Sequence, residues 1–277
     1  MDKLTRSWRL MIASWNVLKQ ERSLIVFPIL SGIGVSLVIA SFWTPLFNMQ
    51  ALSALQHNHG HDTTAAYTLL FLFYFCCYLI TIFFNSALVA CALDRMDGNE
   101  PTLGYGLSTA WERFPQIFGW AFVASTVGLV LRMIEERVGF IGRIVISLLG
   151  MAWTVTSFLV VPVLIAEKRG PIQAYKESTH LLKESWGEQI IGNVGFGMIV
   201  GLVGILPALF LGILLIAAFP QATVFIISIG VLYFIVLMLV QSTLFSIYQA
   251  AVYRYAADGK APPGFEDEYL ADAFRAR

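Results

Sequence analysis

The sequence predicts an all-α, polytopic membrane protein with six transmembrane helices arranged as three hairpins. Six apolar stretches account for most of the 277 residues, and the segments between them are short. A stretch of about 20 apolar residues matches a hydrocarbon core roughly 30 Å thick. Hydrophobic residues make up 57% of the chain and charged residues only 13%, and the mean hydropathy is +0.72. Such stretches are expected to be helical because lipid offers no partner to an open backbone.

We expect one membrane domain over residues 1–277, with an interfacial helix at 1–22 and a cytoplasmic tail at 253–277. The six spans are expected near Ser23–Phe47, Tyr67–Leu93, Pro115–Leu131, Ile144–Ala166, Ile190–Ala218 and Val224–Val252. The first apolar run follows about twenty mostly polar residues and lacks a small-residue cleavage site, so it is interpreted as a span rather than a signal peptide. Pro162 and Pro207 each remove a backbone donor and are candidate kinks.

The Lys and Arg residues predict the orientation. Fifteen of the eighteen lie in the N-terminal segment, the second and fourth connections and the C-terminal tail. The other side holds only three, all in the third connection: Arg132, Arg137 and Arg143. By the positive-inside rule both termini are expected to be cytoplasmic.

A repeated unit precedes the odd-numbered spans. It consists of a short amphipathic helix with a Trp near its end, and we interpret Trp8, Trp15, Trp111 and Trp186 as interfacial anchors. The first helix has Trp8, Met11, Ile12 and Trp15 on one face, and the third has Ile172, Tyr175, Thr179, Leu182 and Trp186. A gate, a partner-docking face or a lipid-head pocket are alternatives to simple anchoring.

The turns that follow the even-numbered spans, which we call the exits, also resemble one another. The turns are Asp97–Pro101, Glu167–Pro171 and Asp258–Pro262, and each contains a charged residue and a Gly before its final Pro. A Gly ends one helix and a Pro opens the next segment in such turns. Internal repeats are common in transport folds, and they also arise by duplication without a transport role.

Polar residues within the spans are the candidates for a cavity. They are Asn85, Asn193, Gln241, Ser242, Ser246 and Gln249. Ser242, Ser246, Gln249 and Tyr253 share one helical face, which predicts either a polar cavity between hairpins or hydrogen bonds across helices. Gly197, Gly201 and Gly204 follow a small-residue pattern that favours close helix packing, within one chain or between copies.

Three histidines in the first external loop, His57, His59 and His61, alternate along the chain. Imidazoles at this spacing are a candidate metal site, and an ordinary polar loop is the alternative. Cys76, Cys77 and Cys91 are interpreted as unpaired apolar residues. No phosphate loop and no zinc-protease or serine-hydrolase motif is present, so no cofactor and no catalytic residue is predicted. Arg132 and Glu136 are spaced to form an ion pair if their helix continues.

The segment Val161–Ile172, with its Ala166-Glu167-Lys168-Arg169-Gly170-Pro171 exit and the Ser/Thr-containing helix that follows, resembles poorly characterised prokaryotic six-span membrane proteins. The opening from Ser14-Trp15 to Phe27-Pro28 points to the same group. The resemblance implies an inner-membrane location and no settled activity, so no functional residue is taken from it.

The function expected from these features is non-enzymatic. We expect transport, or handling of a lipid or other hydrophobic cargo, through a cleft between hairpins. The alternatives are a membrane scaffold or assembly factor that docks a partner on its cytoplasmic helices, and a lipid-modifying membrane enzyme. The expected partner is the lipid bilayer, with a second copy or a membrane partner left open. A formal net charge of zero gives no electrostatic case for nucleic acid.

Overall fold

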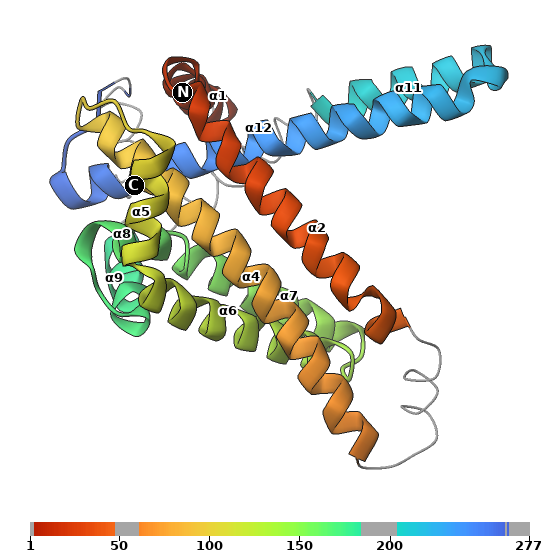
Figure 1. The fold of residues 1–277 in the computed structure, drawn as a ribbon, viewed down its shortest axis with the longest axis horizontal. Coiled ribbons are helices and arrows are strands. Elements are labelled where there is room, and N and C mark those ends of the chain that lie inside the picture. Colours follow the sequence, from red (N-terminus) through yellow and green to blue (C-terminus); the bar gives the residue numbers. More distant parts are fainter. Residues whose placement is uncertain (1–2, 48–60, 184–203, 264, 266–277) are drawn as a thin grey trace. The chain divides into compact units, whose positions relative to one another are not determined.

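A computed structural model describes residues 3–47, 61–183, 204–263 and 265, and within these ranges all regular structure is helical (Figure 1). The α-helices are α1 (Lys3–Gln20), α2 (Val26–Phe47), α4 (His61–Met96), α5 (Leu103–Glu112), α6 (Phe114–Glu135), α7 (Phe140–Thr156), α8 (Val160–Glu167), α9 (Pro171–Lys183), α11 (Leu206–Ala218) and α12 (Thr223–Asp258). Two short 3₁₀ helices, η1 (Arg22–Ile25) and η3 (Pro220–Ala222), precede α2 and α12.

Five segments of the described chain are long and apolar enough to cross a membrane. They are Arg22–Trp43, Tyr67–Met96, Phe114–Glu135, Phe140–Glu167 and Pro220–Asp258. Each overlaps one predicted span, and these helices are compatible with a multi-pass membrane protein. The predicted span Ile190–Ala218 is described only from residue 204 onward, where α11 is an apolar helix of 13 residues. Six spans and three hairpins therefore stay predictions.

The chain divides into two compact units. The terminal unit contains residues 1–25, 91–101 and 180–277, and the central unit contains residues 26–90 and 102–179. Helix α4 supplies residues to both units, since the division falls after Ala90.

In the terminal unit, α1 packs against α12. The buried face of α1 includes Leu10, Ser14 and Val17 at helical spacing. Helices α11 and α12 form a hairpin joined by η3 (Figure 1). A Cβ on Gly204 would lie 3.0 Å from Leu237 Cδ2 in α12, so the chain leading into α11 approaches α12 closely. The apolar side chains of α11 and of the first half of α12 are mostly exposed, as expected of helices that face lipid.

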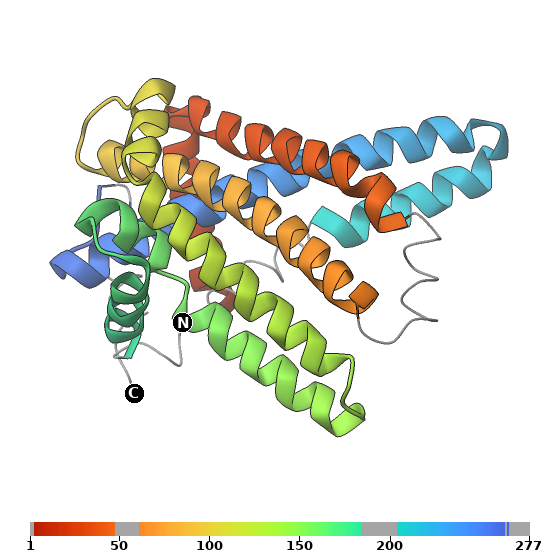
Figure 2. The same ribbon diagram turned by 60° about the horizontal axis from the view of Figure 1, so that its bottom comes forward.

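In the central unit, α6 and α7 lie side by side, as Figures 1 and 2 both show. Aromatic rings connect α4 to its neighbours: Phe73 meets Phe42 of α2 at 5.6 Å, and Phe75 meets Phe118 of α6 at 5.0 Å between centroids. Ring pairs at such separations add to the stability gained from burial.

The third span is longer than predicted, since α6 continues to Glu135. Its last turn carries the predicted pair, with Arg132 Nε 3.2 Å from Glu136 Oε1. Arg132 also donates a hydrogen bond to the Tyr74 hydroxyl of α4. The i,i+4 prediction is confirmed.

Two of the three repeated exits share one backbone geometry. Gly98 and Gly259 follow the two 36-residue helices α4 and α12 with φ values of 89° and 68°. Glycine adopts this left-handed conformation without a steric penalty. At the third exit the left-handed residue is Lys168, with φ of 57°, rather than Gly170. The helix α8 therefore ends one residue before its Arg-Gly-Pro sequence, and Pro171 opens α9 as predicted.

Candidate functional site

The fourth apolar segment is interrupted. Helix α7 ends at Thr156, three residues form a turn, and α8 begins at Val160. Pro162 explains the position, because it has no N–H to donate to the carbonyl of Phe158 four residues earlier. The predicted kink at Pro162 is thus a break just before it. Pro207, the other candidate, lies in the first turn of α11, where a proline is tolerated.

Most backbone groups of the turn form hydrogen bonds within the turn and its flanking residues. The N–H of Phe158 donates to the Val155 carbonyl at 3.1 Å, and the N–H of Val160 donates to the Ser157 carbonyl at 3.2 Å. Both bonds connect residues three apart, which tightens the chain compared with an α-helix. In an α-helix the Leu159 N–H would donate to the Val155 carbonyl, and the Val160 N–H would donate to the Thr156 carbonyl. Because the two observed bonds replace these, the Leu159 N–H and the Thr156 carbonyl have no partner inside the segment.

Ser178 of α9 satisfies both groups. Its hydroxyl accepts from the Leu159 N–H at 3.1 Å and donates to the Thr156 carbonyl at 2.7 Å. Ser178 and Leu159 are fully buried. A buried backbone group without a partner costs about 1–3 kcal/mol. One serine therefore holds the two ends of the interrupted helix in their observed geometry. We call the turn 157–159 together with Ser178 the serine-closed break.

An aromatic stack surrounds the break. Trp153 of α7 lies 5.6 Å from Trp120 of α6 and 5.2 Å from Tyr175 of α9 between ring centroids, with interplanar angles of 20° and 25°. The Tyr175 hydroxyl lies 3.0 Å from Thr156 Oγ1. Three helices of the central unit thus meet at the end of α7.

The fully buried residues of α9 include one member of the predicted apolar face, Leu182, together with two small residues. Ala174 and Ser178 are fully buried, whereas Ile172 is 55% exposed. Of the predicted apolar face, Leu182 is fully buried and Tyr175 is half-buried, and Trp186 lies outside the described residues. The start of α9 lies close to α6, because a Cβ on Gly119 would lie only 2.8 Å from Pro171 Cγ.

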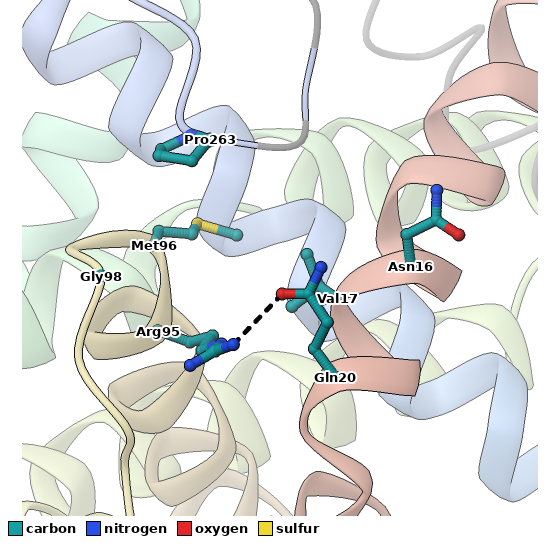
Figure 3. A pocket seen from close by; sticks show the side chains of 7 residues that line it. All are labelled: Asn16, Val17, Gln20, Arg95, Met96, Gly98 and Pro263. Atoms are coloured by element: carbon teal, nitrogen blue, oxygen red, sulfur yellow. Dashed lines mark hydrogen bonds between the residues drawn. The ribbon is translucent and has the colours of Figure 1, made fainter.

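The terminal unit contains a pocket of about 230 Å³. Figure 3 shows its lining, which comes from three separate parts of the chain. The lining residues are Asn16, Val17, Gln20, Arg95, Met96, Gly98 and Pro263. Arg95 is the one charged residue among these seven described lining residues. Its guanidinium donates to the Gln20 side-chain carbonyl at 3.3 Å and to the Asn99 backbone carbonyl at 3.1 Å.

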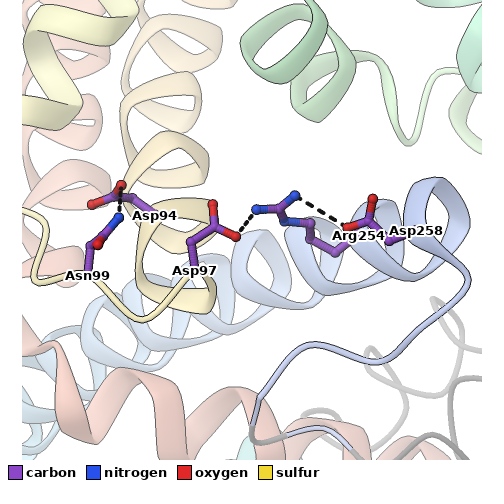
Figure 4. Close-up of polar contacts among 5 residues, drawn as sticks. All are labelled: Asp94, Asp97, Asn99, Arg254 and Asp258. Atoms are coloured by element: carbon purple, nitrogen blue, oxygen red, sulfur yellow. Dashed lines mark hydrogen bonds and ion pairs between the residues drawn. The ribbon is translucent and has the colours of Figure 1, made fainter.

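The two matching Asp-Gly turns meet beside this pocket through one arginine. Arg254 of α12 pairs with Asp97, which precedes Gly98, and lies 3.3 Å from Asp258, which precedes Gly259. Figure 4 shows the guanidinium between the two carboxylates. The neighbouring Asp94 accepts from the Asn99 amide at 2.9 Å.

The predicted polar face of α12 is largely buried. Ser246, Gln249 and Tyr253 are buried, whereas Ser242 is exposed and Gln241 is half-buried. The Ser246 hydroxyl donates to the Ser242 carbonyl of its own helix at 3.0 Å. Asn85 lies half-buried in α4, in the other unit. Asn193 lies outside the described residues, so the polar cavity stays a prediction.

The other predicted sites are described only in part. Trp8, Trp15 and Trp111 are exposed, as an anchor in lipid headgroups must be. His61 is the first residue of α4. Asn193, Gly197, Gly201, Trp186, His57 and His59 lie outside the described residues, so the metal-site prediction and most of the glycine pattern stay predictions.

Two important side chains carry little signal in the local sequence. Pro162 indicates a missing hydrogen bond near the break, but the groups that Ser178 satisfies are backbone atoms, which carry no residue-specific signal. Arg95 contributes to the predicted orientation, and nothing in its local sequence predicts that α1 faces it.

The class of protein is thus a helical one with several apolar helices of membrane-spanning length. Over residues 64–264 the chain matches a family of unknown function, DUF6159, and it belongs to that family. No curated protein matches the chain.

Proposed function

We propose that this protein is a multi-pass inner-membrane protein that moves or presents a lipid or other hydrophobic cargo, with both termini in the cytoplasm. The serine-closed break carries the proposal. Interrupted backbone at membrane depth is tolerated where protein groups satisfy it, and transport folds use discontinuous helices as the elements that bind and move.

Three features support a moving role for the break. It lies within the predicted fourth span, its two halves are joined by only three residues, and its orphaned backbone groups depend on a single side chain. Breaking and re-forming the Ser178 bonds would let α8 change direction relative to α7 and return to the observed geometry. A continuous helix has no equivalent point of adjustment.

The test uses the full chain reconstituted in liposomes that contain fluorescent phospholipid, with entrapped small polar solutes in a parallel set. The wild type should accelerate lipid movement across the bilayer or release a solute. Pro162→Ala restores an N–H that can donate to the Phe158 carbonyl and should straighten the segment, reducing the rate without destabilising the protein. Ser178→Ala should reduce the rate as well. Ser125→Ala is the matched control, because Ser125 is a fully buried serine of α6 that donates to Phe122 of its own helix at 3.0 Å.

A protein that moves neither lipid nor solute across a broad panel would contradict the proposal. So would a Pro162→Ala variant with the same rate as the wild type. The proposed topology, with six spans and three hairpins, is tested separately by labelling cysteines introduced at positions 58 and 138, which should react from outside intact cells.

A scaffold is the second candidate, and α1 favours it. Trp8, Ile12 and Trp15 are each 40–42% exposed on one face, while Leu10 and Val17 are buried on another. An exposed apolar face on a packed helix suits either the headgroup region or a partner helix. Purification from native membranes should separate the two: a stoichiometric partner that Trp8→Ala and Trp15→Ala together abolish would favour the scaffold. For the third alternative, a lipid-modifying enzyme, the described lining of the pocket offers one ionisable side chain, Arg95.

A further inference from the structure

We propose that the pocket of the terminal unit binds a phosphate-bearing anion, which is the headgroup phosphate of a phospholipid or a free phosphate. The proposal deepens the proposed lipid-handling function and rests on it for the source of the ligand. Both possible ligands present a compact oxyanion, which accepts hydrogen bonds from a guanidinium and from a side-chain amide.

Within the part of the chain that the structure describes, the charged residue of the pocket forms no ion pair. Arg95 donates to the Gln20 side chain and to the Asn99 carbonyl, both of which are neutral acceptors. Among the described residues no carboxylate forms an ion pair with Arg95. The nearest acids in the sequence are engaged elsewhere, Asp94 with the Asn99 amide and Asp97 with Arg254. Arginine is the side chain best suited to phosphate, because its planar fork presents several donors at once.

The rest of the lining suits a small polar anion on a partly apolar floor. Asn16 and Gln20 lie one helical turn apart on α1 and carry amide groups (Figure 3). Val17, Met96 and Pro263 supply apolar contact, and none of the described lining residues is a carboxylate. The volume of about 230 Å³ exceeds the roughly 150 Å³ of a cavity that holds benzene, so a phosphate group fits with room for part of an adjoining group.

The position of the pocket agrees with a lipid source. It lies where α4 ends, on the side that the Lys and Arg distribution predicts to be cytoplasmic, and α1 forms one wall. The same α1 carries the exposed Trp8 and Trp15, which suit the headgroup level. The anionic lipids of the cytoplasmic leaflet would then supply phosphate at that depth.

The test uses the full-length protein in a neutral detergent and measures its thermal unfolding against two probes. One probe is inorganic phosphate, and the other is short-chain dihexanoyl phosphatidic acid below its micelle concentration. A bound ligand raises the unfolding temperature in a concentration-dependent way. Stabilisation by phosphatidic acid alone assigns the site to a lipid headgroup, and equal stabilisation by inorganic phosphate assigns it to the free ion.

Arg95→Gln should weaken the apparent affinity by about tenfold or more, because it removes a charged hydrogen-bond donor. Asn16→Ala should weaken it by about threefold to tenfold for the loss of one hydrogen bond. Asn16 is exposed, so this second variant keeps the test valid if Arg95→Gln fails to fold. Arg169→Gln is the matched control, since it removes one positive charge on the same predicted side from a residue that pairs with Glu167 and Glu177 in the central unit.

Stabilisation by neither probe would overturn the proposal, and so would an equal loss in Arg95→Gln and Arg169→Gln, because that outcome indicates general attraction to positive charge. Failure here is distinguishable from failure of the proposed function. Liposomes in which Pro162→Ala slows lipid movement while no probe binds would keep the function and refute the pocket. Probe binding without lipid movement would do the reverse.

Discussion

Ser14 of α1 and Ser178 of α9 are two fully buried serines in helices that the sequence presents as copies of one repeat. The Ser14 hydroxyl donates to the Leu10 carbonyl of its own helix at 3.0 Å. The Ser178 hydroxyl instead joins Thr156, the last residue of α7, to Leu159, the residue before α8. A repeated amphipathic helix therefore does not imply a repeated role. The serine of α1 bonds within its own helix, whereas the serine of α9 bonds to the backbone on both sides of the turn between α7 and α8.

The largest expected effect separates these serines. Ser178→Ala leaves a buried N–H and a buried carbonyl without partners, so the free energy of unfolding should fall by about 2–4 kcal/mol. Ser14→Ala removes a bond to a carbonyl that the helix already uses, so the loss should stay below about 0.5 kcal/mol. Unfolding of each variant by titration with sodium dodecyl sulfate in mixed micelles measures the difference. Equal losses would show that the bridge contributes nothing beyond an ordinary buried serine.

The second prediction examines how closely α9 is held. Gly119→Ala would place a Cβ 2.8 Å from Pro171 Cγ at the start of α9. Overpacking of this kind costs about 1–3 kcal/mol. The control is Gly150→Ala in α7, where a new Cβ meets nothing within 4 Å; the higher helix propensity of alanine should leave stability unchanged or raise it by up to about 1 kcal/mol. If both variants behave alike in the micelle titration, α9 is not tightly docked on α6.

The sequence predicted well those features that depend on local chemistry. Apolar stretches located the five candidate spans, Pro162 indicated the break, and Gly98 and Gly259 marked helix ends. These signals are local because hydropathy, a missing N–H and a tolerated φ belong to single residues or short windows.

The candidate site could not be predicted in the same way. Ser178 acts on backbone atoms about twenty residues away, and Arg95 faces Gln20 across 75 positions of the chain. The chosen polar residues of α12 were read from helical spacing, which gives their common face but not what covers it. Tertiary packing buries two small residues of α9, Ala174 and Ser178, as fully as the apolar Leu182.

The third prediction concerns the exits, where the repeats do behave alike. Gly98 and Gly259 both have left-handed backbone conformations, at φ of 89° and 68°. Gly98→Ala and Gly259→Ala should each lower the free energy of unfolding by about 1 kcal/mol, since a Cβ is strained in that region. Lys168 already bears this strain at φ of 57°, so Lys168→Gly should give a small gain. If only one of the two glycine variants lost stability, the two turns would not be equivalent.

The smallest expected effect is that of Arg254, which links the two equivalent turns. Its side chain is 27% exposed, and those of Asp97 and Asp258 are 49% and 56% exposed. Water therefore screens both pairs, and exposed ion pairs contribute about 0–1 kcal/mol. Arg254→Gln should cost no more than about 1 kcal/mol at low ionic strength, and the cost should shrink as salt shortens the Debye length from about 10 Å at 0.1 M to about 3 Å at 1 M. Unfolding in a nonionic detergent at the two salt concentrations measures this change. A loss of stability well above the Ser14→Ala value that persists at high salt would contradict this expectation. Arg254 would then hold the two turns together through hydrogen-bond geometry rather than through charge, much as Ser178 holds the ends of α7 and α8 together.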